Sequence, residues 1–78
     1  MTNTINKPEK VIRIGSVSAS VWKRAGKDGN GVYYTVQFQR SYRTDKGVQY
    51  TDSFNHEDIL NLSEIARRTE TWIASQIN

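Results

Sequence analysis

The side chains best suited to chemistry lie in residues 32–43, which read Val-Tyr-Tyr-Thr-Val-Gln-Phe-Gln-Arg-Ser-Tyr-Arg. Alternation with a period of two predicts a β-strand and is incompatible with a helix. One face of this strand begins with Tyr33, ends with Arg43, is polar between them and carries no carboxylate. Aromatic rings can stack on bases and cations can neutralise phosphates. Single-stranded nucleic acid is therefore the first ligand that this surface suggests.

The other face of the same strand begins as one wall of a core, with Tyr34, Val36 and Phe38. Arg40 and Tyr42 follow on that face, where the apolar pattern ends. An aromatic ring among cations at the end of a strand indicates ligand contact more strongly than one in mid-strand does.

Charge is distributed unevenly along the 78 residues, whose net charge is +3. Residues 1–50 hold nine Lys and Arg against three Asp and Glu, whereas residues 51–78 hold two against five. The first part contains the expected strands and the second the expected helix. This asymmetry favours a polyanionic ligand on the sheet side.

Turn-forming residues divide the first part of the chain into strands. Gly15, the glycine-rich segment 25–31 and the turn 44–47 separate expected strands at 10–14, 16–24, 32–43 and 48–54. Residues 1–9 are expected to be a disordered lead-in, and residues 10–78 a single domain. A small core and the absence of cysteine leave a second copy of the chain as the best remaining source of buried apolar area.

The C-terminal part predicts one amphipathic helix, with Asn55 as its N-cap and Asp58 placed to complete a capping box. Apolar and small residues then recur at three- and four-residue spacing. These are Leu62, Ile65, Ala66, Thr69, Trp72, Ile73 and Ile77. The expected fold class is α+β, a four-stranded antiparallel meander followed by one helix.

Catalysis and metal binding find little support in the sequence. The single histidine, His56, has no Ser, Cys or second His as a local partner, and Glu57 and Asp58 suit the start of a helix. The glycines of 25–31 lack the spacing of a phosphate-binding loop. We therefore expect no enzyme activity and no cofactor. No apolar run reaches the length of a membrane span, and no signal-peptide core is present, so we expect a cytoplasmic protein without membrane contact. The expected nucleic-acid ligand would make this protein nucleoid-associated.

Several aromatic and basic residues have two interpretations each. Trp22 alternates against Val17, Ala19 and Val21, so it either stacks on a base or packs against another subunit. Tyr33 either contacts ligand or forms a cross-strand aromatic pair with Trp22. Arg43 and Lys46 either bind phosphate or are solvated charges that protect a strand edge.

These patterns resemble the DNA-binding domain of the positive cofactor four family, transcription coactivators related to the plant Whirly proteins. The resemblance covers roughly residues 11–70. It rests on Ile-Arg-Ile-Gly at 12–15, Ser-Val-Trp at 20–22, Val-Gln-Phe-Gln-Arg-Ser-Tyr at 36–42 and the passage through Ser53-Phe54-Asn55 into a helix. Members are homodimers that bind single-stranded DNA or melted duplex with little sequence preference.

The resemblance also implies roles for individual residues. Tyr42 matches the family's base-stacking aromatic, and Gln39 stands where the family has a basic residue that contacts the backbone. Trp22, Lys23, Arg24 and Lys27 match the second strand and its loop. The expected nucleic-acid-binding residues are thus Trp22, Lys23, Arg24, Lys27, Tyr33, Gln39, Arg40, Tyr42, Arg43 and Lys46; those of the dimer interface are Trp72, Ile73 and Ile77.

The resulting hypothesis is a non-enzymatic homodimer that binds single-stranded DNA in transcription, replication or recombination. Two alternatives use the same residues. One is a protein-interaction module whose basic sheet docks an acidic partner, with Trp22 and Tyr33 as hot spots. The other is an RNA-binding protein, which differs only in whether a 2′-hydroxyl is recognised.

Overall fold

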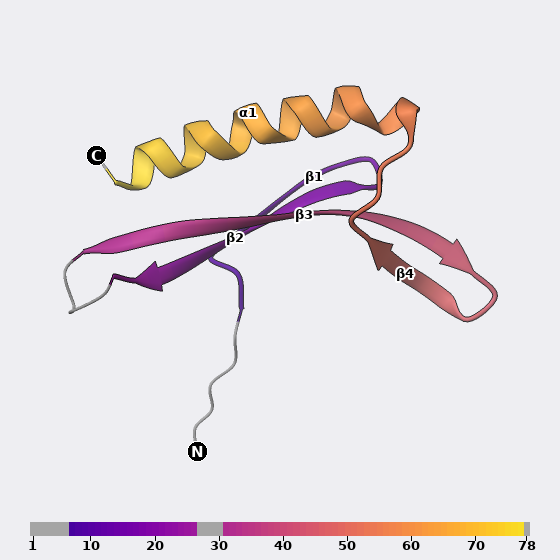
Figure 1. Ribbon diagram of the computed structural model, residues 1–78, viewed down its shortest axis with the longest axis horizontal. Helices are drawn as coiled ribbons and strands as arrows, with labels where there is room; N and C mark the ends of the chain where they lie inside the picture. Colours follow the sequence, from indigo (N-terminus) through magenta and orange to yellow (C-terminus); the bar gives the residue numbers. More distant parts are fainter. Residues whose placement is uncertain (1–6, 27–30, 78) are drawn as a thin grey trace, which may run out of the picture.

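The computed structural model describes residues 7–26 and 31–77, which form a four-stranded antiparallel sheet and one long helix (Figure 1). The strands are paired in sequence order, β1-β2-β3-β4. A 3₁₀ turn, η2 (His56–Asp58), precedes the helix. The elements are β1 (Lys10–Ile14), β2 (Val17–Ala25), β3 (Val32–Thr44), β4 (Gly47–Thr51) and α1 (Ile59–Gln76). The α+β fold class predicted from the sequence is confirmed.

Alternation along β2 places one set of its side chains under the helix. Val17, Ala19 and Val21 are fully buried, as is Ile65 of α1. Partly buried apolar side chains from β1, β3, the segment before η2, and α1 pack around them. These are Ile12, Ile14, Val36, Phe38, Phe54 and Leu62. The helix therefore covers one face of the sheet and leaves the other face uncovered (Figure 1).

Two glycines make the tight turns between strands possible. Gly15, with φ +60°, turns β1 into β2, and a Cβ there would lie 3.4 Å from the Asn61 side-chain nitrogen of α1. Gly47, with φ +108°, opens β4. Both backbone conformations are costly for any residue with a side chain. The predicted break at Gly15 is thus confirmed as a turn.

The helical segment begins after Asn55, as the sequence predicts, but its first turn, His56–Asp58, is 3₁₀ and α1 itself begins at Ile59. The Asn55 backbone N–H donates to Asp58 Oδ2 at 3.0 Å, and the Asp58 N–H donates to the Asn55 carbonyl at 2.9 Å. These bonds satisfy amide groups that a helix start otherwise leaves free. Within residues 7–26 and 31–77, no helix has the length and apolarity needed to cross a membrane.

Apart from shifts of one residue at other strand ends, three sequence expectations differ from the structure. The fourth strand ends at Thr51 rather than at residue 54, because the Ser53 N–H bonds to Thr51 Oγ1 at 3.1 Å and the chain turns toward the helix. Ala66, expected in the apolar stripe of the helix, is exposed. Of the expected lead-in, residues 1–6 lie outside the described residues, whereas the Glu9 N–H is bound to the Val21 carbonyl at 2.7 Å.

Candidate nucleic-acid interface

The sheet surface turned away from α1 is here called the open face. The β2–β3 register places Ser18, Ser20, Trp22 and Arg24 of β2 on this face, because they alternate with Val17, Ala19 and Val21, which lie under the helix. Ser18 is itself only 6% exposed. The remaining strands contribute Val11 and Arg13; Tyr33, Thr35, Gln37, Gln39, Ser41 and Arg43; and Val48 and Tyr50. Both ends of β3 bend away from the helix, so the open face is concave (Figure 1).

The charge of the strands has one sign. None of the four strands contains an Asp or Glu, whereas they contain Lys10, Arg13, Lys23, Arg24, Arg40 and Arg43. Arg13, Arg24 and Arg43 belong to the open face. A concave surface with cations and no carboxylate of its own attracts a polyanion regardless of sequence.

Aromatic and basic side chains meet at one end of the open face. Arg24 is paired with Tyr33 across the β2–β3 ladder, and its guanidinium carbon lies 5.5 Å from the centre of the Trp22 ring. Tyr33 is 52% exposed. Trp22 is paired with Thr35, so the two aromatic rings are diagonal rather than direct cross-strand neighbours. This end of the sheet offers flat rings beside a cation, as a stacked base and its phosphate require.

The opposite end of the open face has a second group of this kind. Tyr50 of β4 is paired with Ser41 and is 55% exposed, and Arg43 is paired with Val48 one step further along the hairpin. Between the two ends the face carries Ser, Thr and Gln side chains with Arg13 at the β1 edge. The distance from Tyr33 to Arg43 along β3 is about 33 Å at 3.3 Å per residue.

Three expected ligand residues lie on the other side of the sheet. Lys23, Arg40 and Tyr42 share the face of Val21 and Phe38, because adjacent residues of a strand point in opposite directions. Lys23 is exposed, and Tyr42, 41% exposed, lies in the part of β3 that pairs with β4, opposite Gln49. The structure therefore does not bring Trp22, Lys23 and Arg24 to one surface, although they are consecutive.

Arg40 has partners within the chain. Its Nε donates to the Ser53 carbonyl at 3.0 Å and lies 3.4 Å from Asp58 Oδ2, and its side chain is only 18% exposed. Its guanidinium also stands over the Tyr42 ring, 5.8 Å from the centroid. These contacts assign Arg40 to the junction between sheet and helix.

Gln39, Lys46 and Lys27 complete the expected set. Gln39 lies on the open face, half-buried, in the row of Ser18 and Arg13. Lys46 is exposed in the β3–β4 turn, where its backbone N–H bonds to Thr44 Oγ1 at 3.1 Å. Lys27 lies outside the described residues.

Two of the aromatic and basic residues on the open face were not among the sequence candidates, Arg13 and Tyr50. Alternation in β1 places Arg13 on the opposite face from the apolar Ile12 and Ile14. Pairing the strands as a meander therefore predicts that Arg13 lies on the open face. Tyr50 needed the exact β3–β4 register, because a shift of one residue would move it to the helix side.

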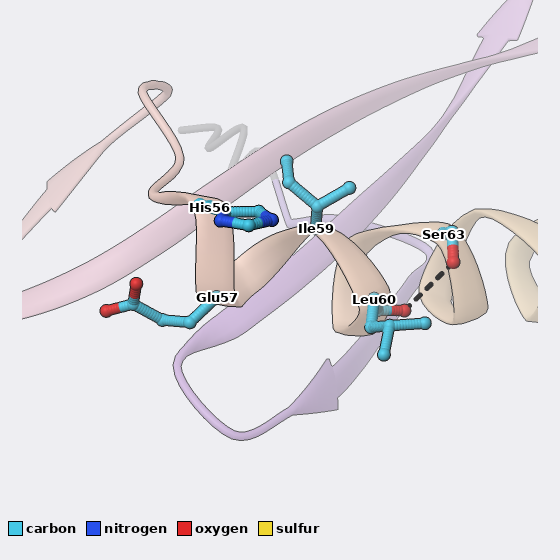
Figure 2. Close-up of a pocket in the computed structure, with 5 residues that line it drawn as sticks. All are labelled: His56, Glu57, Ile59, Leu60 and Ser63. Carbon is cyan, nitrogen blue, oxygen red and sulfur yellow. Dashed lines mark hydrogen bonds between the residues drawn. The ribbon is translucent and has the colours of Figure 1, made fainter.

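The helix start forms a separate surface hollow, lined by His56, Glu57, Ile59, Leu60 and Ser63 (Figure 2). The Ser63 hydroxyl donates to the Leu60 carbonyl at 2.9 Å, and the Glu57 carboxylate extends away from the imidazole. His56 therefore has neither an activated hydroxyl nor an orienting carboxylate in this hollow. Among the described residues, no group of three or more His, Cys, Asp or Glu side chains could hold a metal ion.

Acidic charge on the helix is partly neutralised by its own arginines. Glu64 Oε2 accepts bonds from Arg67 at 2.7 Å and from Arg68 at 2.8 Å. Hydrogen bonds from Arg67 and then Arg68 lower the pKa of Glu64 to about 2. The same bond raises the pKa of Arg67 above its ordinary value.

Comparisons with known proteins give no independent assignment. No family model matches this chain, and searches of curated proteins and of solved structures found no significant match. The function must therefore be argued from the interface itself.

Proposed function

We propose that this protein is a non-enzymatic binder of single-stranded DNA, which lies along the open face of the sheet with little sequence preference. One observation carries the proposal: the strands contain no carboxylate, and each end of the open face carries an exposed tyrosine and an arginine on adjacent strands. Rings stack on any base and cations contact any phosphate, so such a surface needs no particular sequence.

The polar centre of the face suits a ligand that crosses it. Ser20, Thr35 and Gln37 can donate hydrogen bonds to phosphate or base edges without fixing a sequence. Arg13 adds a cation at the β1 side, between the two aromatic groups and nearer to Tyr50. A site about 33 Å long lies within the range of roughly 4–16 nucleotides covered by other small single-strand-binding modules.

A second copy of the chain is part of the proposal, as the sequence predicted. Trp72 already packs edge-on against Tyr34, with ring centroids 6.0 Å apart, so it supports β3 from the helix. Ile73 is half-buried, and Ile77 at the helix end is 63% exposed. We place Trp72, Ile73 and Ile77 at the border of the subunit contact. Sedimentation at micromolar concentration is expected to show a dimer, and a monomer there would remove this part of the proposal.

Fluorescence anisotropy with oligothymidine, duplex DNA and oligouridine of equal length tests the ligand. We expect oligothymidine to bind more tightly than duplex, with log affinity falling linearly with log salt concentration. Tighter binding of oligouridine would favour RNA as the natural ligand. Absence of salt-dependent binding to all three would overturn the proposal and favour an acidic protein partner for the same face.

A further inference from the structure

One edge of β3 has no partner strand among the described residues. β4 pairs only with residues from Arg40 to Thr44, although β3 begins at Val32 and pairs with β2 along its other edge. The outer edge of residues 32–38 therefore adjoins no described strand. An unpaired strand edge is a template for pairing with another chain.

The hydrogen bonds of β2 show which groups of β3 face this edge. The Gly26 N–H bonds to the Gly31 carbonyl at 3.0 Å, and the Ser41 N–H bonds to the Ser16 carbonyl at 2.9 Å. In an antiparallel ladder these bonds recur at every second residue, so the odd-numbered residues of β3 bond to β2. The N–H and C=O groups of Val32, Tyr34, Val36 and Phe38 consequently point outward.

This edge also lacks the protection seen on the other strands. Residues 32–38 contain no charge, no proline and no glycine. By contrast, β1 is short and carries Lys10 and Arg13, and the part of β2 beyond β1 carries Lys23 and Arg24. Exposed edges are ordinarily blunted by such charges or by shortness. An unprotected β-prone segment of seven residues is an aggregation hazard unless a specific partner covers it.

The edge is complementary to itself. Antiparallel pairing of two copies about Thr35 places Val32 against Phe38 and Tyr34 against Val36, so every outward-facing residue meets another one. A shift by two residues in one direction would bring position 32 against Arg40, whose outer edge β4 already occupies. A shift in the other direction would leave Phe38 without a partner within residues 32–38. Residues 32–38 of the two copies, paired about Thr35, are here called the seam. Neither copy presents a charge to the other along the seam. The seam also covers the half-buried side chains of Val36 and Phe38. This burial matters because few apolar side chains of the chain are fully buried.

We infer that two copies of this chain pair through residues 32–38 of β3, antiparallel and centred on Thr35, and so join their open faces into one surface. In this arrangement Tyr33 of one copy lies across the seam from Gln37 of the other, on the open face of both. A strand that stacks on Tyr33 would then continue onto polar side chains of the second subunit. The inference deepens the proposed function, because it places the nucleic-acid site across both copies.

Cysteine cross-linking tests the seam, since the chain has no cysteine of its own. In the proposed register Thr35 faces its own copy as a non-hydrogen-bonded pair, at a Cα separation of about 4.5 Å that suits a disulfide. Thr35→Cys should give a covalent dimer with oxidised glutathione at least tenfold faster than Thr71→Cys. Thr71 is also an exposed threonine but lies on the helix, in a groove beside Ile12 of β1. Equal rates for the two variants would overturn the seam.

A charge exchange at the same position gives a second, independent readout. Thr35→Lys and Thr35→Glu each place like charges across the seam and should weaken the dimer by roughly fivefold. An equimolar mixture should recover the wild-type dimer affinity, which a folding defect could not produce. Dimers as tight as wild type for each variant alone, or no recovery on mixing, would contradict the inference.

The proposed seam and the proposed nucleic-acid ligand can be refuted independently. If wild-type protein binds no single strands but Thr35→Cys cross-links, the seam is correct and the nucleic-acid proposal is wrong. If wild-type protein binds single strands but Thr35→Cys reacts no faster than Thr71→Cys, the reverse holds.

Discussion

Arg40 and Asp58 connect the sheet to the helix start, with Arg40 Nε 3.4 Å from Asp58 Oδ2. Both side chains are largely shielded from water, at 18% and 12% exposed. Asp58 also accepts the Asn55 N–H that opens the helix, and Arg40 also donates to the Ser53 carbonyl. One pair thus fixes the turn from β4 into α1, so the most central cation of β3 has a structural role.

Removing this pair should destabilise the fold without changing the charge dependence of binding. Arg40→Ala leaves a shielded carboxylate without its cation and should reduce the free energy of unfolding by about 2–3 kcal/mol. Urea unfolding of Arg40→Ala, Asp58→Ala and the double variant measures the coupling. Additive losses would show that the two residues act independently.

The open face should carry the salt dependence of binding. Arg43→Ala is expected to lower the slope of log affinity against log salt by roughly 0.7 and to weaken all sequences about equally. Arg67→Ala removes the same charge from the helix, which covers the opposite side of the sheet. Equal changes of slope in the two variants would mean that net charge, and not the open face, attracts the ligand.

The two faces of the β3–β4 hairpin can be compared directly. Tyr50 lies on the open face, and Tyr42 lies on the other face of the same hairpin, under the Arg40 guanidinium. Tyr50→Ala should lose about 1–3 kcal/mol of single-strand affinity, the contribution of one stacked base, and Tyr42→Ala should lose less. Anisotropy titrations with oligothymidine measure both. The opposite order would move the ligand to the Tyr42 side, as the family resemblance implies.

Periodicity in the sequence predicted most of the fold, because burial of one face of a strand or helix requires apolar residues at regular spacing. The alternation of Val17, Ala19 and Val21 identified the core side of β2, and the cap at Asn55 identified the start of the helix. The end of β4 could not be predicted, because the turn depends on the Thr51 hydroxyl bonding to Ser53. The exposure of Ala66 depends on the rotation of α1 over the sheet, which apolar spacing alone leaves open.

The candidate site was predictable only in part, because neighbours in sequence are not neighbours on a sheet. Trp22 and Arg24 belong to the open face, but Lys23 between them does not. The charge of Arg40 suggests a ligand contact, but its partners Ser53 and Asp58 lie in a segment whose path only the fold defines. Register, rather than composition, decides which cations share a surface.

Acid should weaken the helix through Glu64. Its pKa is lowered to about 2 from 4.5 in the folded state, so its bonds to Arg67 and Arg68 contribute stability above pH 4.5 that is lost as the pH falls toward 2. Thermal melts from pH 5 to pH 2 should therefore show a smaller fall for Glu64→Gln than for wild type. Added salt should reduce the difference, because the Glu64 side chain is 35% exposed. Parallel pH profiles for the two proteins would contradict this role.

Thr69 offers a substitution that should stabilise the protein. Its side chain is 2% exposed, and its hydroxyl has no hydrogen-bond partner among the described residues. Thr69→Val keeps the shape and removes a buried polar group that lacks compensation, so we expect a gain of about 1 kcal/mol. Thr71→Val, on the exposed side of the same helix, should stay within about 0.5 kcal/mol of wild type. A loss of stability in Thr69→Val, measured by urea unfolding of both variants, would show that the hydroxyl is satisfied in solution, by water or by the carbonyl one turn earlier.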